Sequence, residues 1–124
     1  MTLGLLENLQ LPTRGLRSKS WNEFARPGAP VMDFVFTVCD QAAGEACPLW
    51  PGNPVTAHWG VPDPAAVQGT EAEQRRAFRE TYVALENRIK LLAALPIDKL
   101  DRFTIKRNVD EIGRHDVASK LELP

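Results

Sequence analysis

Three residues of this sequence have the types and spacing that redox or acid–base chemistry needs. Cys39 and Cys47 are the two cysteines of the chain, and the loop between them is rich in small residues, including Gly44. Such a loop is flexible enough to bring two sulfurs together, so reversible disulfide chemistry is feasible. Asp63 stands before Pro64, which favours an extended backbone at Asp63 and limits where its carboxylate can lie. A carboxylic acid held near a reacting oxyanion can protonate a leaving oxygen.

Structural interpretations of the same residues stay open. Cys39 can equally be a small core hydrophobe and Cys47 an incidental surface thiol, and Asp-Pro is also a common turn dipeptide. The two cysteines could also be half of a metal site, but His58 and His115 have no ligand-like spacing to them. The sequence therefore predicts no metal ion, and His58 is interpreted as a hydrogen-bonded structural residue.

Two short strands are expected to position the candidate groups. The segment 33–39 is nearly continuous in apolar and β-branched residues, as in a strand covered on both faces of a parallel sheet. A second strand is expected over 55–59, ended by Gly60. Strands that alternate with helices predict an α/β fold, and sites in parallel sheets form beyond the carboxyl ends of the strands. Cys39 ends the first strand and Asp63 follows the second, so both are expected at one edge of the sheet.

Helices are expected before and after these strands. Leucines at helical spacing predict a short helix within 1–10, and Ser20 is expected to cap a second one, with Glu23 at the capping-box position. Thr70 and Glu73 form a further capping box that opens a long amphipathic helix. Its apolar face is expected to consist of Phe78, Tyr82, Leu85, Ile89 and Leu92.

The last helix completes the expected domain. It is predicted over 98–112, with Gly113 in the usual position of a C-terminal glycine. The elements together predict one domain over 1–113, followed by a loosely ordered tail over 114–124.

The composition is that of an ordinary globular chain and excludes several classes of function. The 124 residues suffice for one domain, and 44% of them are hydrophobic and 25% charged. Lys and Arg number 15 against 16 Asp and Glu, whereas a dedicated nucleic-acid or membrane-surface binder needs a basic excess. No apolar run is long enough to span a bilayer, and residues 1–10 lack the features of a signal peptide. A cytoplasmic location is therefore expected.

The residues around the two cysteines and Asp63 form four short motifs. They are Phe-Val-Phe-Thr-Val-Cys-Asp at 34–40, Cys-Pro at 47–48, Ala-His-Trp-Gly at 57–60 and Pro-Asp-Pro-Ala at 62–65. In this order they resemble bacterial arsenate reductases of the low-molecular-weight tyrosine phosphatase superfamily, and the segments 15–20 and 100–113 are similar to the same family. The resemblance extends over nearly the whole chain to Gly113. It implies a partial Rossmann-like, three-layer fold in which the first strand and the phosphate-binding loop are absent.

The resemblance also implies a role for each candidate residue. In that family a first cysteine attacks arsenic, and a second thiol resolves the covalent adduct. By match of position, Cys39 would be the resolving thiol or the next redox cysteine, Cys47 the last thiol of the relay, and Asp63 the general acid. The implied substrate is arsenate, and the implied external reductant is thioredoxin or a glutathione/glutaredoxin system, with no bound cofactor. Tyrosine phosphatases of this fold usually carry an aromatic residue after the Asp-Pro dipeptide, so Ala65 and Ala66 favour the reductase branch.

The sequence departs from the family at its Cys-x5-Arg loop. Glu45 follows Cys39 by six positions and Asn53 follows Cys47 by six, so neither cysteine has the arginine. Backbone N–H groups of that loop cradle the oxyanion, and the helix after it lowers the pKa of the nucleophile. We therefore expect an N-terminally truncated arsenate reductase that is inactive alone, which leaves open whether the chain is itself an enzyme.

Two other functions stay open. Two parallel strands rarely form a stable sheet by themselves. The chain could therefore be a non-catalytic fragment that self-associates, or one that completes its fold with a complementing N-terminal chain. It could also be a small dithiol redox protein that uses Cys39 and Cys47 alone.

Overall fold

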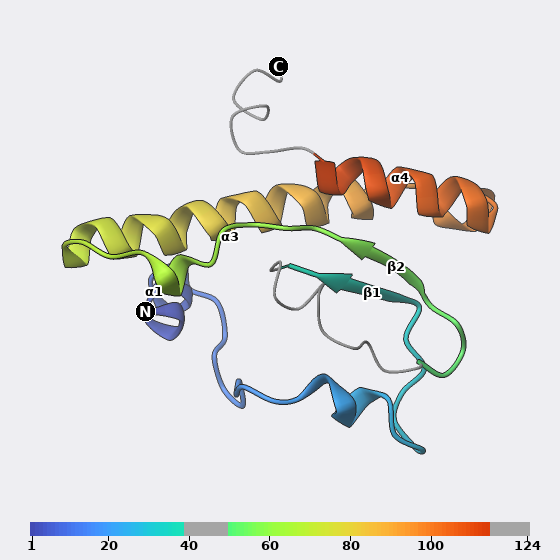
Figure 1. Ribbon diagram of the computed structural model, residues 1–124, viewed down its shortest axis with the longest axis horizontal. Coiled ribbons are helices and arrows are strands. Elements are labelled where there is room, and N and C mark those ends of the chain that lie inside the picture. The colour runs from blue at the N-terminus through green and yellow to red at the C-terminus, as the bar shows by residue number, and fades with distance from the viewer. Residues whose placement is uncertain (39–49, 115–124) are drawn as a thin grey trace.

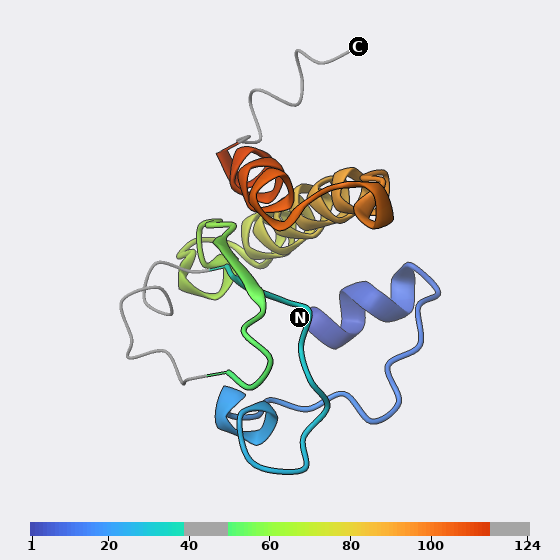
Figure 2. The same cartoon turned by 90° about the vertical axis from the view of Figure 1, so that its right-hand side faces the viewer.

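The computed structural model describes residues 1–38 and 50–114, which form a mixed α/β structure (Figure 1). In both views α3 and α4 lie above the strands, and the segment with the first 3-10 turn passes below them (Figure 2). In chain order the elements are α1 (Thr2–Asn8), a 3-10 turn at Trp21–Phe24, β1 (Phe34–Thr37), β2 (Val55–His58), a 3-10 turn at Pro64–Ala66, α3 (Glu71–Ala93), a 3-10 turn at Ile97–Lys99 and α4 (Arg102–Arg114). No helix in the described part of the chain is long and apolar enough to cross a membrane.

The two strands pair in parallel, as predicted. Phe34 lies opposite Val55, and Thr37 lies opposite His58. The pairing continues past the strands, since the N–H of Trp59 donates to the carbonyl of Thr37 at 2.7 Å. The described residues do not fully cover either face of the first strand, contrary to the expectation, because all four residues of β1 are only half-buried. β2 alternates between buried and exposed residues, so the described elements bury one face of the sheet.

The core lies between the strands and one face of α4. Ile105, Val109 and Ile112 occur at helical spacing on that face and are buried. Trp59 follows β2 and is 3% exposed, and its ring stacks on Phe36 with the ring centroids 3.9 Å apart. Its indole N–H donates to the carbonyl of Val109 at 2.9 Å. Trp59 therefore joins the sheet to α4 both by packing and by a directional bond.

Gly113 does not close α4, contrary to the sequence-based expectation. The helix continues to Arg114, a residue that the sequence places in the tail. A Cβ atom at Gly113 would lie 2.7 Å from the carbonyl oxygen of His58 and 2.7 Å from Cδ1 of Trp59. The missing side chain therefore lets α4 approach the end of β2 closely, and this contact, rather than a turn, requires the glycine.

α3 begins as predicted, and four residues of its expected apolar face are half-buried: Phe78, Tyr82, Leu85 and Leu92. The N–H of Glu73 donates to Oγ1 of Thr70 at 3.1 Å, and the carboxylate of Glu73 accepts from the N–H of Thr70, which confirms the capping box. The buried residues of the helix are Ala84 and Arg88, whereas Ile89, expected on the apolar face, is 57% exposed. α3 packs against α4 and the 3-10 turn after β2. A small residue such as Ala84 suits that close contact better than a large one.

α4 begins at Arg102, later than expected, because a 3-10 turn comes before it in the segment predicted as one helix. The turn at Ile97–Lys99 ends at Leu100, whose backbone is extended. Oδ1 of Asp101 then accepts the N–H of Thr104 at 2.7 Å and caps the new helix. The pKa of the Asp101 carboxyl is lowered, mainly by the hydrogen bond from the backbone of Thr104 and secondly by the one from the Thr104 side chain.

In the N-terminal segment, the predicted cap at Ser20 is confirmed and the predicted capping box with Glu23 is wrong. α1 lies within the predicted range, and Oγ of Ser20 accepts the N–H of Asn22 at 3.2 Å. Glu23 does not complete a capping box. Its carboxylate accepts from Arg17 at 2.9 Å instead, and this hydrogen bond is the main cause of the lowered pKa of Glu23. The pair is exposed and contributes little to stability.

Candidate functional site

Asp63 lies beyond the carboxyl end of β2, as the sequence predicts. Pairing between the two chain segments that leave the sheet extends to the N–H of Val61, which donates to the carbonyl of Val38 at 2.8 Å. Val38 directly precedes Cys39, and Val61 lies two residues before Asp63. The exits of both strands are therefore held together at one edge of the sheet. Cys39 and Cys47 themselves lie outside the described residues.

The carboxylate of Asp63 is held by the turn that follows it. Its Oδ1 accepts the backbone N–H of Ala65 at 2.9 Å, so Asp63 caps the turn at Pro64–Ala66. Its backbone is extended, as expected before a proline. The side chain is exposed, and the described residues offer its carboxylate no second hydrogen-bond donor. A fixed carboxylate that faces solvent can serve both as a turn cap and as a proton donor.

Arg88 of α3 is a site residue that sequence reasoning missed. Its charged side chain is only 3% exposed, and burial lowers the pKa of the guanidinium. Nη1 donates to the carbonyl of Trp59 at 2.7 Å and to that of Gly60 at 3.1 Å. These bonds hold the chain where it leaves β2, shortly before Asp63. The available signal was the position of Arg88 four residues after Ala84, which places it on the inward side of the helix.

His58 is a hydrogen-bonded structural residue, as predicted. Its Nδ1 lies 2.7 Å from Oγ1 of Thr37, the residue directly opposite it in the ladder. The contact joins the last residues of both strands. An open depression of about 700 Å³ lies beside His58, between the exit of β2 and the last turn of α4. Pro62, the residue before Asp63, lines it, but Asp63 does not.

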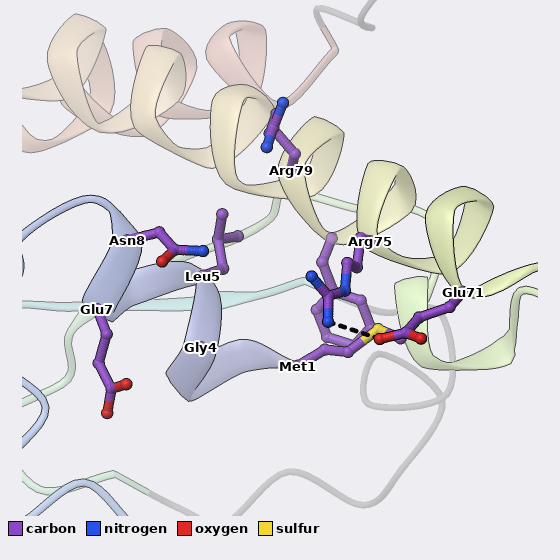
Figure 3. Close-up of a pocket in the computed structure, with 9 residues that line it drawn as sticks. Met1, Gly4, Leu5, Glu7, Asn8, Glu71, Arg75 and Arg79 are labelled. Carbon is purple, nitrogen blue, oxygen red and sulfur yellow. Dashed lines mark hydrogen bonds and ion pairs between the residues drawn. The ribbon is translucent and has the colours of Figure 1, made fainter.

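A second cavity, of about 490 Å³, lies between α1 and the first turns of α3 (Figure 3). Arg75 and Glu71 pair with each other on its wall, and the carboxylate of Glu7 points away from this pair (Figure 3). None of the predicted site residues lines this cavity. Nowhere in residues 1–38 and 50–114 do three or more His, Cys, Asp or Glu side chains group as metal ligands would.

Part of this sequence is similar to known proteins that share one name. Over 61 residues this chain is 41% identical to proteins named arsenate reductase from Oceanobacillus iheyensis, Halalkalibacterium halodurans and Bacillus subtilis. Half of this chain is similar to arsenate reductases. The match covers 49% of the chain and 43% of each relative, so the chain matches less than half the length of these proteins. No protein-family model and no solved structure matches the sequence.

The match confirms part of the resemblance that the motifs indicate. Arsenate reductases are the similar proteins, and the similar segment is about half of the chain. Two further statements stay predictions. One is that the resemblance extends to Gly113, and the other is the cysteine relay that the resemblance implies.

Proposed function

We propose that this chain supplies the general acid and the later thiols of arsenate reduction by a cysteine relay. Cys39 resolves the arsenic adduct, Cys47 takes over the disulfide, and Asp63 is the general acid. The observation that carries the proposal is the 41% identity to arsenate reductases over 61 residues.

The electron balance of the reaction explains why a chain with two cysteines suits these steps. Arsenate contains As(V) and arsenite contains As(III), so each turnover takes two electrons, which two thiolates supply as they become one disulfide. One arsenate oxygen leaves as water, and an acid such as Asp63 supplies a proton to it. The disulfide then moves to Cys39 and Cys47. An external dithiol such as thioredoxin reduces it and restores the thiols.

The geometry at the edge of the sheet supports this assignment. The exits of β1 and β2 are bonded to each other between Val38 and Val61, which brings the chain next to Cys39 close to the chain that leads to Asp63. The Asp63 carboxylate is both exposed and oriented by Ala65. Attack on arsenic needs a further thiol in an anion-binding loop, because neither cysteine of this sequence has an arginine six positions later.

Arsenate-dependent oxidation of NADPH, coupled through thioredoxin and thioredoxin reductase, tests the proposal. The 124-residue polypeptide alone should show no turnover above a no-protein control, because its sequence has no Cys-x5-Arg loop to cradle the oxyanion. Fusion to the part of the Bacillus subtilis relative that the match leaves uncovered, in that relative's own order, should produce turnover. Cys39→Ser or Cys47→Ser should then abolish it.

Aspartate variants of the fused protein test the acid separately. Asp63→Asn should slow turnover by roughly 10²–10⁴-fold, whereas Asp98→Asn, at an exposed aspartate of a distant turn, should leave it unchanged. A folded but inactive fusion would contradict the proposal. Turnover by the unfused polypeptide, lost on Cys39→Ser, would point instead to the small dithiol redox protein.

A further inference from the structure

The two outer edges of the sheet are covered differently. Along β2, the carbonyl of Pro54 accepts from Nη2 of Arg102 at 3.2 Å, and the carbonyl of Thr56 accepts from Nζ of Lys106. Both carbonyls point away from β1, and both donors belong to α4. The helix therefore lies along the side of β2 that faces away from β1, where Figure 1 shows it. Another strand could not reach this edge without displacing α4.

Within residues 1–38 and 50–114, the outer edge of β1 has no such cover. The carbonyls of Asp33 and Thr37 accept hydrogen bonds from the chain of β2. Because bonding alternates along a parallel ladder, the N–H and C=O groups of Phe34 and Phe36 point away from β2. No backbone or side-chain group in the described part of the chain bonds to these outward groups. A row of unpaired groups of this kind is a template for another strand.

We propose that β1 pairs antiparallel with β1 of a second copy of this chain, which gives a four-stranded sheet in the order β2-β1-β1-β2. The contact uses the same surface on both copies, and α4 blocks both remaining edges, so the assembly closes as a dimer instead of growing into a fibre. The rings of Phe34 and Phe36, with centroids 5.8 Å apart, lie on the sheet face that packs against Trp59. Pairing extends this apolar layer across both copies. The inference does not depend on the proposed function.

The positions of the outward groups determine the register. An antiparallel pair in which Phe34 lies opposite Phe36 of the second copy lets both residues exchange their N–H···O=C bonds. Val35 then lies on the two-fold axis, opposite Val35 of the second copy. Asp33, the charged residue of this stretch, lies opposite the neutral Thr37. Parallel pairing in register would instead place the like charges of Asp33 and the second copy's Asp33 beside each other.

Val35→Lys tests the dimer because it places two ammonium groups against each other on the axis. Sedimentation equilibrium at micromolar concentration should give the wild type about twice the chain mass of 13.8 kDa. Like charges facing each other across an interface are costly, so the dissociation constant should rise at least about tenfold in the variant. Thr56→Lys is the matched control, since Thr56 lies directly opposite Val35 on β2 but one strand further from the axis. It should leave the dimer intact.

A cross-link keeps the test valid even if the lysine unfolds the chain. In a Cys39→Ser, Cys47→Ser background, Val35→Cys should form a disulfide-linked dimer on mild oxidation, because directly opposite residues of an antiparallel pair lie within reach of a disulfide. Thr56→Cys should not cross-link to a comparable extent. A monomeric wild type, equal dissociation of the two lysine variants, or equal cross-linking at positions 35 and 56 would each overturn the proposal.

Discussion

Replacing Trp59 by alanine should lower the free energy of unfolding by roughly 3–5 kcal/mol. The side chain is 3% exposed, its ring stacks on Phe36, and its N–H bonds to the carbonyl of Val109. Alanine would leave a cavity where the sheet meets α4 and would leave that carbonyl without its indole donor. No other side chain in the described residues connects the sheet to α4 through both a ring stack and a hydrogen bond.

Urea unfolding followed by far-UV circular dichroism measures this effect, at one fixed protein concentration so that self-association does not change the comparison. Trp59→Phe keeps a ring but loses the N–H, so it should lose an intermediate amount of stability. Trp21→Ala removes a half-buried tryptophan and should cost less than Trp59→Ala. A loss below roughly 1 kcal/mol in Trp59→Ala, no larger than an average substitution, would contradict the central place of this ring in the core.

Arg88→Met should be the second most damaging change among those considered. Methionine fills much of the same space, but it cannot donate to the carbonyls of Trp59 and Gly60. A buried acceptor left without its donor costs roughly 1–3 kcal/mol. We also expect faster amide hydrogen exchange at 60–66, because the guanidinium holds the chain that leads to Asp63.

Arg79→Met is the matched control, since it makes the same chemical change on an exposed face of the same helix. Its effect should stay within about 0.5 kcal/mol. Arg88→Lys, which keeps one charged donor group, should fall between the two variants. Equal stability and equal hydrogen exchange in Arg88→Met and Arg79→Met would show that Arg88 does not organise this edge of the sheet.

Local signals in the sequence predict the elements whose partners are close along the chain. The capping box at Thr70 and Glu73 depends on groups three positions apart, and it forms as expected. The β-branched and apolar character of 33–39 likewise predicts β1 and its parallel pairing. Glu23 shows the limit of such signals, because a nearby Arg17 competes for its carboxylate and prevents the second box.

Residues whose role depends on distant contacts could not be predicted in the same way. Arg88 bonds to a carbonyl 29 positions away. The spacing of apolar residues along the helix treats it as a polar surface residue and does not predict its burial. Gly113 is required by its contact with His58 and Trp59, yet its place near a helix end looks the same as a terminal cap. The position of Asp63 at the sheet edge was predictable, because parallel strands bring their carboxyl ends together.

The cysteine relay, the central claim, is tested most directly by mapping the disulfide state of the chain after mild oxidation. Mass spectrometry of a non-reducing digest should find the peptides of Cys39 and Cys47 linked within one chain, and thioredoxin should return both to free thiols. Cys47→Ser should remove the link, while Thr56→Ser, an exposed residue of β2, should leave it unchanged. Both thiols still free at a redox potential that oxidises glutaredoxin-like dithiols would contradict the relay.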